Sequence, residues 1–366
     1  MADTGKTERL GFLDGLRGWG AILVFVYHLV YRFLAKDQPW LAPDSIKLLM
    51  DGQFAVFVFF VISGYALSHA NLDPARRDLQ MAATSRYFRL AIPILVTTFI
   101  GYLLLKAGLL ISADVSRETG VSGDWLGTFY TFPASGYDFV KFSLFNSFFY
   151  YYSRESYNSS LWTISYEFLG SMIVYGYLAV FRSHGRGQWI IAVAAFLVCI
   201  KVAPIYACFF GGYLAAEARY SIAIRADWKW VVELLALLTF YSIGVVMTFA
   251  RPGNEDFGAL ALLATSLVFA VTFSRYLRSF FSNRLSSFLG RVSFPLYLFH
   301  IFVICSWSSY LFVWLPTTGL AVPAQMAINI VSTAAICLVC ATALLPVEKF
   351  SVRYSKKIAA LILRRT

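Results

Sequence analysis

Long apolar stretches follow one another along almost the whole chain, separated by short polar segments. A helix that crosses the hydrocarbon core of a bilayer needs about 20 mostly apolar residues. By this measure ten stretches are candidate membrane helices, at roughly 13–34, 52–70, 88–110, 161–181, 188–201, 203–217, 230–250, 257–274, 292–315 and 324–346. The pattern therefore predicts an all-α membrane protein, a polytopic bundle of about ten transmembrane helices.

The composition agrees with this pattern. Apolar residues make up 59% of the 366 residues and charged residues only 14%, whereas soluble domains carry about 25% charged residues. This excludes a soluble enzyme, a disordered protein and a nucleic-acid binder. Because no internal repeat or low-complexity linker interrupts the chain, we expect one domain over 1–366, with a core at about 11–346 and a short basic cytoplasmic tail at 347–366.

The positive charges predict the orientation. If the N-terminus lies in the cytoplasm, 21 of the 31 Lys and Arg residues fall in cytoplasmic segments and nine in outer segments. Cytoplasmic loops of membrane proteins carry such an excess. We therefore expect both termini in the cytoplasm and, as the location, a multi-pass protein of the plasma (inner) membrane.

The first apolar stretch contains three ionisable residues, which are costly in hydrocarbon and mark functional sites by default. Arg17 and His28 are 11 residues apart, so on a regular helix they share one face about 16 Å apart. Asp14 precedes Arg17 by three residues and can pair with it. We interpret this as a polar stripe, beside which glycines leave room for a neighbouring helix or a ligand: Gly15, Gly18 and Gly20.

Glu167 is the one acid deep in the fourth stretch. It lies about 9 Å inside that helix, at a depth similar to that of His28. We therefore predict a His28–Glu167 pair, either a functional one or a structural hydrogen bond between helices. Arg86 and Arg89 open the third stretch on one helix side, where they either clamp a phosphate or serve as ordinary positive-inside anchors.

Other features carry less information. His300 lies about 12 Å into the ninth stretch and is expected to line the same cavity. Ser63, with Gly64 after it, indicates close packing or a tunnel wall. The aromatic outer segment 111–160 is either an interfacial belt or a lid over a flat acceptor. Cys337 and Cys340 have no polar neighbours, so we expect no metal site.

Five motifs occur in order: FLDGLRGWGAILVFVYH, FFVISGY, the Arg86/Arg89 pair, SLWTISYEF and FLGRVSFPLYLFH. Together they resemble the acyltransferase 3 family, the integral membrane O-acyltransferases. The resemblance covers about residues 11–300 and implies ten core helices. It also implies that an acyl group, commonly acetyl, moves from cytoplasmic acyl-coenzyme A to a hydroxyl of a glycan, lipid-linked sugar or natural product.

The resemblance also assigns residues. Arg17 and His28 match the family's first-helix Arg and His, Arg86 and Arg89 its paired arginines, and Glu167 its acid. Catalysis is then expected from His28 and Glu167, and acyl-coenzyme A binding from Arg17, Arg86 and Arg89. Asp14, Ser63, Trp162 and His300 are the expected cavity lining. The coenzyme is a donor substrate, so no bound cofactor is expected; the other partners are membrane lipid and the hydroxyl acceptor.

Two mechanisms and a second function stay open at this stage. His28, oriented by Glu167, takes the proton of the acceptor hydroxyl, or it carries the acyl group itself as an acyl-imidazole. The alternative function is a proton-coupled secondary transporter that uses the same two residues. Transporters often have two matching halves, and the sequence has no such duplication.

Overall fold

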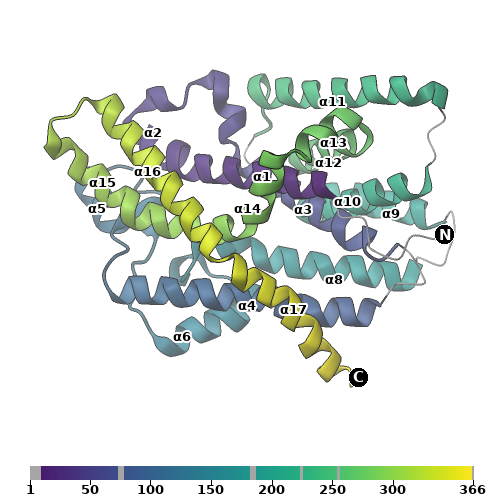
Figure 1. Ribbon diagram of the computed structural model, residues 1–366, viewed down its shortest axis with the longest axis horizontal. Coiled ribbons are helices and arrows are strands. Elements are labelled where there is room, and N and C mark those ends of the chain that lie inside the picture. Colours follow the sequence, from purple (N-terminus) through teal and green to yellow (C-terminus); the bar gives the residue numbers. More distant parts are fainter. Residues whose placement is uncertain (1–9, 73–77, 182–186, 223–225, 254–255, 365–366) are drawn as a thin grey trace. The chain divides into compact units, whose positions relative to one another are not determined.

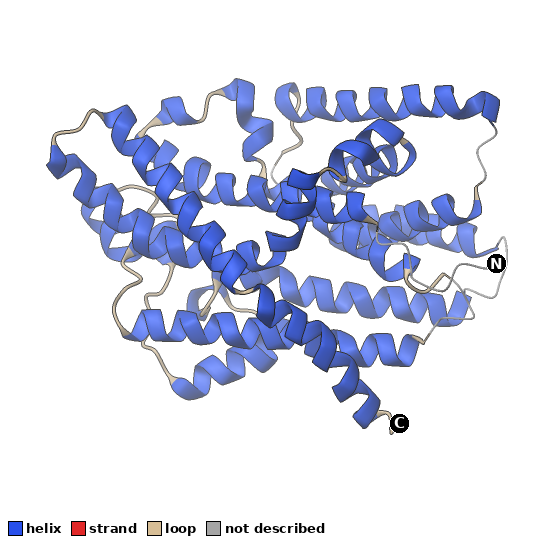
Figure 2. Ribbon diagram, in the orientation of Figure 1, coloured by secondary structure: helices blue, strands red, loops and turns tan. Residues whose placement is uncertain are grey.

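The structure is a computed structural model that describes residues 10–72, 78–181, 187–222, 226–253 and 256–364. Within these ranges the chain forms helices joined by loops, without strands (Figure 2). Its contacts divide it into two compact units. Unit 1 is Met1–Gly20, Gln53–Ala83 and Leu169–Arg291; unit 2 is Ala21–Gly52, Thr84–Phe168 and Val292–Thr366.

Every stretch predicted from the hydrophobic pattern falls on a helix (Figure 1). The long helices are α1 (Gly11–Val26), α3 (Gly52–His69), α4 (Leu79–Lys106), α8 (Ile164–Phe181), α9 (Gly187–Val202), α10 (Pro204–Ser221), α11 (Lys229–Phe249), α12 (Phe257–Phe273), α14 (Arg284–Val303), α16 (Val322–Ala343) and α17 (Leu345–Ile362). Shorter helices are α2 (Ala35–Asp37), α5 (Ser112–Thr119), α6 (Gly136–Lys141), α7 (Ser147–Phe149), α13 (Arg275–Phe281) and α15 (Ser309–Trp314). Two π-helical segments continue long helices: η1 (Tyr27–Leu34) follows α1, and η9 (Ile304–Ser308) follows α14.

Among the described residues, seven helical segments are long and apolar enough to cross a membrane. They are Gly11–Asp37, Asp44–His69, Leu79–Lys106, Ser159–Phe181, Lys229–Phe249, Arg284–Thr318 and Val322–Ile362. The bent pair α12 and α13 would make an eighth, and α9 is a shorter apolar helix. A multi-pass helical protein is therefore confirmed, while the count of ten spans stays a prediction.

In unit 1, glycines let helices pack at backbone contact. A Cβ atom built on Gly18 would lie 2.5 Å from the backbone nitrogen of Gly290 in α14, and one built on Gly15 would lie 1.8 Å from the Phe281 carbonyl oxygen. Gly64 of α3 approaches the backbone of Phe209 in α10 in the same way. The glycines of the first helix, and the one after Ser63, thus make room for neighbouring helices.

A bend of 98° separates α12 from α13. At the end of α12, the carbonyl oxygen of Thr272 accepts hydrogen bonds from the guanidinium groups of Arg219 and Arg278. At the start of α13, the carboxylate of Glu233 accepts from the backbone N–H of Arg275 at 2.8 Å. Because the polar groups at both helix ends have partners, the chain can turn sharply here.

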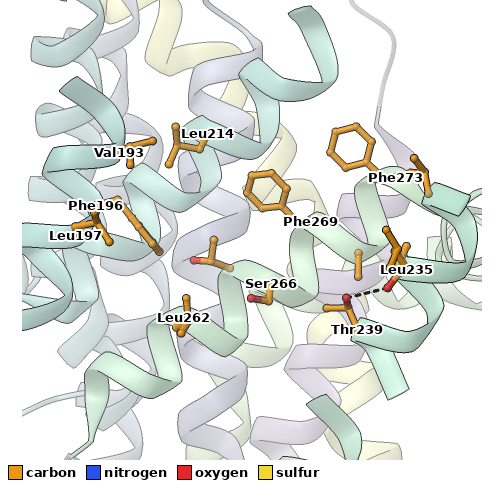
Figure 3. Close-up of a pocket in the computed structure, with 14 residues that line it drawn as sticks. Val193, Phe196, Leu197, Leu214, Leu235, Thr239, Leu262, Ser266, Phe269 and Phe273 are labelled. Carbon is orange, nitrogen blue, oxygen red and sulfur yellow. Dashed lines mark hydrogen bonds between the residues drawn. The ribbon is translucent and has the colours of Figure 1, made fainter. Parts of the chain in front are cut away.

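Unit 1 also has an open apolar groove of about 590 Å³ between α9, α10, α11 and α12. Figure 3 shows Phe269 and Leu235 among its walls, and the Thr239 hydroxyl donates to the Leu235 carbonyl at 2.8 Å rather than into the groove. The lining contains no ionisable side chain. The groove therefore offers an apolar surface and no residue that could act as an acid or a base.

In unit 2, the segment before α8 is irregular but buried. It ends in the 3₁₀ helix η7 (Ser159–Thr163), and the exposed fraction of Asn158 is 0%. The Asn158 side chain donates to the carbonyl of Leu298 in α14 at 2.7 Å. Irregular backbone inside a membrane protein is tolerated only where the protein satisfies its polar groups. The Asn158 contact therefore fixes the segment before α8 against the C-terminal half of α14.

The basic C-terminal segment forms the helix α17, and its assignment as a cytoplasmic tail stays a prediction. In α17, Ser351, Ser355 and Ala359 follow one another every four residues and are buried on one face. The Ser351 hydroxyl donates to the carbonyl of Arg89 in α4 at 2.7 Å. This small-residue face allows α17 to lie close to α4, while its basic residues occupy the other side.

Candidate active site

His28 lies in unit 2 on the π-helical segment η1, and its ring meets that of His300 on α14. The Nδ1 atom of His28 and the Nε2 atom of His300 are 2.8 Å apart. The two ring planes differ by 9°, with centroids 5.0 Å apart. With nitrogens so close and centroids so far apart, the rings are nearly coplanar and meet edge to edge. This arrangement suits an N–H···N hydrogen bond.

The other nitrogen of His300 faces its own helix. Its Nδ1 lies 3.1 Å from the carbonyl oxygen of Leu296 and 2.9 Å from that of Tyr297. The exposed fraction of His300 is 1%. Both ring nitrogens of this buried histidine therefore have partners.

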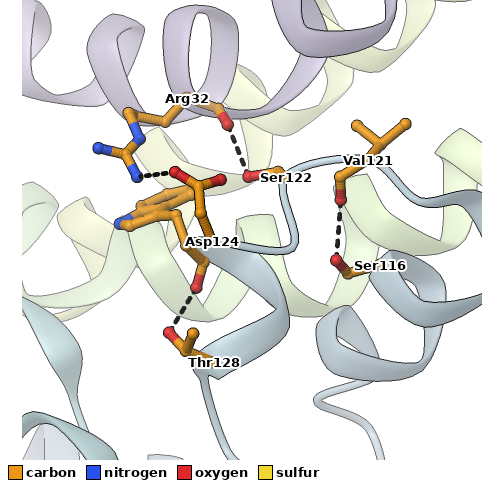
Figure 4. A network of polar contacts seen from close by, with 7 residues as sticks. Arg32, Ser116, Val121, Ser122, Asp124 and Thr128 are labelled. Atoms are coloured by element: carbon orange, nitrogen blue, oxygen red, sulfur yellow. Dashed lines mark hydrogen bonds and ion pairs between the residues drawn. The ribbon is translucent and has the colours of Figure 1, made fainter.

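Trp125 stacks on the face of His28, with ring centroids 5.1 Å apart and planes 16° apart. The Arg32 guanidinium lies 5.4 Å from the Trp125 ring centroid and is ion-paired with Asp124 at 3.2 Å. Figure 4 shows this pair, together with the Ser122 hydroxyl, which donates to the Arg32 carbonyl at 2.7 Å. The outer segment is thus tied to the helix that carries His28, and Trp125 covers the imidazole.

The backbone around Trp125 is strained. Ser122 and Tyr130 have φ values of 55° and 58°, in the left-handed region that non-glycine residues rarely adopt. Burial raises the pKa of Tyr130 well above its ordinary value. The strained residues lie on both sides of Trp125 in the sequence, and one of them, Tyr130, is also buried. We infer that the surrounding structure fixes this loop.

Glu167 does not pair with His28, which corrects the prediction. Its carboxylate forms an ion pair with Arg86 on α4, and the two side chains are 15% and 11% exposed. The prediction compared only the depths of the two residues along their helices, and depth does not determine which side chains are neighbours. Glu167 lies beside α4, and His300 takes the place beside His28 that was expected for Glu167.

Within unit 2, a row of polar groups nevertheless runs between the His28–His300 pair and the Arg86–Glu167 pair. The Tyr297 hydroxyl lies 2.9 Å from the Thr163 hydroxyl, and it also donates to the carbonyl of Ser160. Tyr297 precedes His300 by about one helical turn, and Thr163 precedes Glu167 by about one turn. The sequence of polar groups thus runs from His28 through His300, Tyr297 and Thr163 to the Arg86–Glu167 pair.

The other predicted site residues are distributed over both units. Arg17 pairs with Asp14 at 3.6 Å in unit 1, as the three-residue spacing predicted. Arg89 is exposed on α4. Trp162 is 37% exposed and its ring contacts that of Tyr166. Ser63 is half-buried on α3. Their proposed roles remain predictions.

Sequence reasoning missed Trp125 and Tyr297 as neighbours of the histidines. Trp125 was one of many aromatic residues in 111–160, so its position gave no separate signal. Tyr297 stands three residues before His300 in the SFPLYLFH motif. That spacing places both side chains on one helix side and could have identified it.

Comparison with known proteins gives two matches. A family model described as an acyltransferase domain matches residues 10–344. The O-acetyltransferase PaAT-1 of Phomopsis amygdali is 26% identical in an alignment 361 positions long, gaps included, and the match covers 79% of this chain and 71% of that protein. No solved structure matches the chain.

Proposed function

Because the chain belongs to the acyltransferase 3 family and is an integral membrane O-acyltransferase, we propose that it transfers an acetyl group from cytoplasmic acetyl-coenzyme A to a hydroxyl-bearing acceptor. The acetyl group is inferred from the name of the relative from Phomopsis amygdali, which is an O-acetyltransferase. The proposed acceptor class is a glycan, a lipid-linked sugar or a natural product. The observation that carries the catalytic proposal is the fixed imidazole of His28.

In this proposal His28 acts as the general base. The imidazole removes the proton from the acceptor hydroxyl while the oxygen attacks the thioester carbonyl carbon. The new C–O bond forms as the C–S bond breaks, and the departing thiolate takes the proton from the imidazolium. A neutral histidine is needed at the start, and a half-buried ring whose Nδ1 edge meets a neutral imidazole suits that role.

The donor would be bound through its phosphates by arginine. Of the two arginines in unit 2, Arg89 is exposed and is therefore the better candidate for a phosphate contact. Arg86 is already ion-paired with Glu167, so its proposed contribution is to keep this buried pair in place along the row of polar groups. For Arg17 in unit 1, the proposed donor contact rests on the family resemblance.

The acceptor would meet aromatic surface on the outer segment. Tyr137 and Tyr150 are 74% and 79% exposed there. Exposed aromatic rings provide flat apolar surface that suits a sugar ring or another planar face. This supports a hydroxyl acceptor on a ring, presented from the side of the chain that carries Trp125.

The test is acetyl transfer by the purified protein in liposomes, followed as release of free coenzyme A in the presence of candidate acceptors. We expect His28→Ala to lower the rate by at least about 100-fold, the low end of the contribution of a positioned general base. His69→Ala, a second histidine on α3, is the matched control and should retain activity. Full activity of His28→Ala would exclude the proposed mechanism.

A further inference from the structure

The hydrogen bonds of His300 determine which of its nitrogens carries a proton. Carbonyl oxygens only accept hydrogen bonds. The Nδ1 atom of His300 faces two of them, those of Leu296 and Tyr297, at 3.1 and 2.9 Å. The proton of this ring therefore lies on Nδ1.

The second nitrogen of His300 then has a lone pair. A doubly protonated ring would be a buried cation, which is costly without a paired anion, and the exposed fraction of His300 is 1%. In the neutral ring, Nε2 accepts a hydrogen bond. Its partner at 2.8 Å is Nδ1 of His28, so that nitrogen is the donor.

We propose that His300 is a positioning residue that holds His28 in the Nδ1–H tautomer, so that Nε2 of His28 carries the reactive lone pair. Two backbone carbonyls of α14 fix the proton of His300, and His300 in turn fixes the proton of His28. The coplanar rings and the Trp125 ring on the face of His28 hold the orientation. The catalytic consequence rests on the proposed function; the tautomer itself does not.

The hydrogen bond from Nδ1 of His28 to Nε2 of His300 also stabilises the charged form of His28 during the reaction. When Nε2 of His28 takes the acceptor proton, the ring becomes an imidazolium and its Nδ1–H···N bond to His300 becomes charge-assisted. A carboxylate performs this task in hydrolytic triads. Here a neutral imidazole performs it, so no buried negative charge is required beside the catalytic ring.

A pair of substitutions separates this role from simple packing. Gln at position 300 can place its carbonyl oxygen where Nε2 stands and accept the same proton, whereas Phe fills the space with no acceptor. We expect His300→Phe to lower kcat by about 100-fold or more and to change the KM for acetyl-coenzyme A by less than about twofold. His300→Gln should recover at least about tenfold of that loss. Equal activity of the two variants would overturn the proposal.

The tautomer can be measured without any turnover. Nitrogen NMR of protein labelled in its four histidines, with His28 assigned from the His28→Ala spectrum, distinguishes a protonated from a bare ring nitrogen. We expect the Nδ1–H form of His28 in the wild type and in His300→Gln, and a mixture of tautomers in His300→Phe. A wild-type proton on Nε2 would overturn the proposal.

The two kinds of failure are distinguishable. The Nδ1–H form in a protein that fails to use acetyl-coenzyme A supports the positioning role and counts against the proposed donor. An active protein whose His28 carries its proton on Nε2 retains the proposed function and excludes the role of His300.

Discussion

The imidazole of His28 is oriented by neutral groups. His300 contacts its Nδ1 edge, Trp125 covers one face, and Tyr27 lies beside it with ring centroids 5.2 Å apart. A carboxylate next to this ring would bring a second charge into the apolar interior, which is costly to bury. Of the two carboxylate–guanidinium pairs described above in unit 2, Glu167 with Arg86 lies farther along the row of polar groups, and Arg32 with Asp124 lies beside the Trp125 ring.

This pair gives a prediction for stability at the level of single residues. Glu167→Gln leaves the Arg86 charge without its carboxylate in a site where the arginine side chain is 11% exposed. Removing one partner of a buried pair costs about 3 kcal/mol. We therefore expect a lower midpoint of thermal unfolding in detergent for Glu167→Gln.

The matched control replaces both charges. The double variant Arg86→Met with Glu167→Leu removes the pair without leaving an unpaired charge, so its unfolding midpoint should lie well above that of Glu167→Gln. A double variant as unstable as the single one would show that the pair contributes more than charge compensation.

Single residues were predictable from the sequence where a helix position was enough. Asp14 and Arg17 pair as their spacing predicts. The identity of the partner of His28 was not predictable. Counting residues along a straight helix gives the position of a side chain along the helix axis, but it does not show which neighbouring helix that side chain faces. The π-helical turn at Tyr27–Leu34 and the buried segment before α8 change the positions on which that count depends.

At the level of elements, glycines decide how closely helices approach. Gly18→Ala would place a methyl group 2.5 Å from a backbone atom of α14, which cannot move away as a side chain would. Overpacking of this kind costs about 1–3 kcal/mol. We expect a lower thermal unfolding midpoint for Gly18→Ala.

Gly176→Ala is the control for this prediction. A Cβ atom built on Gly176 in α8 meets nothing within 4 Å. Since alanine has the higher helix propensity by about 1 kcal/mol, this variant should unfold at the same or a higher temperature. Equal destabilisation by the two substitutions would exclude close packing as the cause.

The hydrophobic pattern predicted the helices well: every long apolar stretch of the sequence is helical in the structure. It did not predict the bend after Phe273, which depends on Arg219 and Glu233 from other helices. Nor did it predict that α17 is a helix, since its buried face consists of small and polar residues such as Ser351 and Ser355. Contacts between elements, rather than local preference, determine these features.

For the whole molecule, composition alone identified the membrane class, because 14% charged residues cannot cover a soluble body of this size. The division into two compact units could not be read from the sequence, since the unit boundaries fall inside continuous helices such as α1 and α14. Only the boundary at 52/53 stands beside a loop, at the start of α3.

The number of crossings is the property of the whole chain that remains to be measured, and three exposed positions can decide it. With ten spans and cytoplasmic termini, Tyr137 of α6 and Val202 at the end of α9 lie outside the cell, and Lys356 of α17 lies inside. Tyr137 is 74% and Val202 79% exposed. Cysteine at 137 or 202 should therefore react with a membrane-impermeant maleimide in intact cells, whereas cysteine at 356 should react only after permeabilisation.

The background for this experiment replaces Cys199 and Cys340 by alanine, because the other three cysteines are buried. Val202→Cys is the decisive site. If it reacts only after permeabilisation while Tyr137→Cys reacts in intact cells, α9 and α10 form a hairpin that returns to the cytoplasmic side. The chain would then cross the membrane eight times, with both termini still inside, since removing a pair of crossings leaves the bias of positive charge at the two ends unchanged.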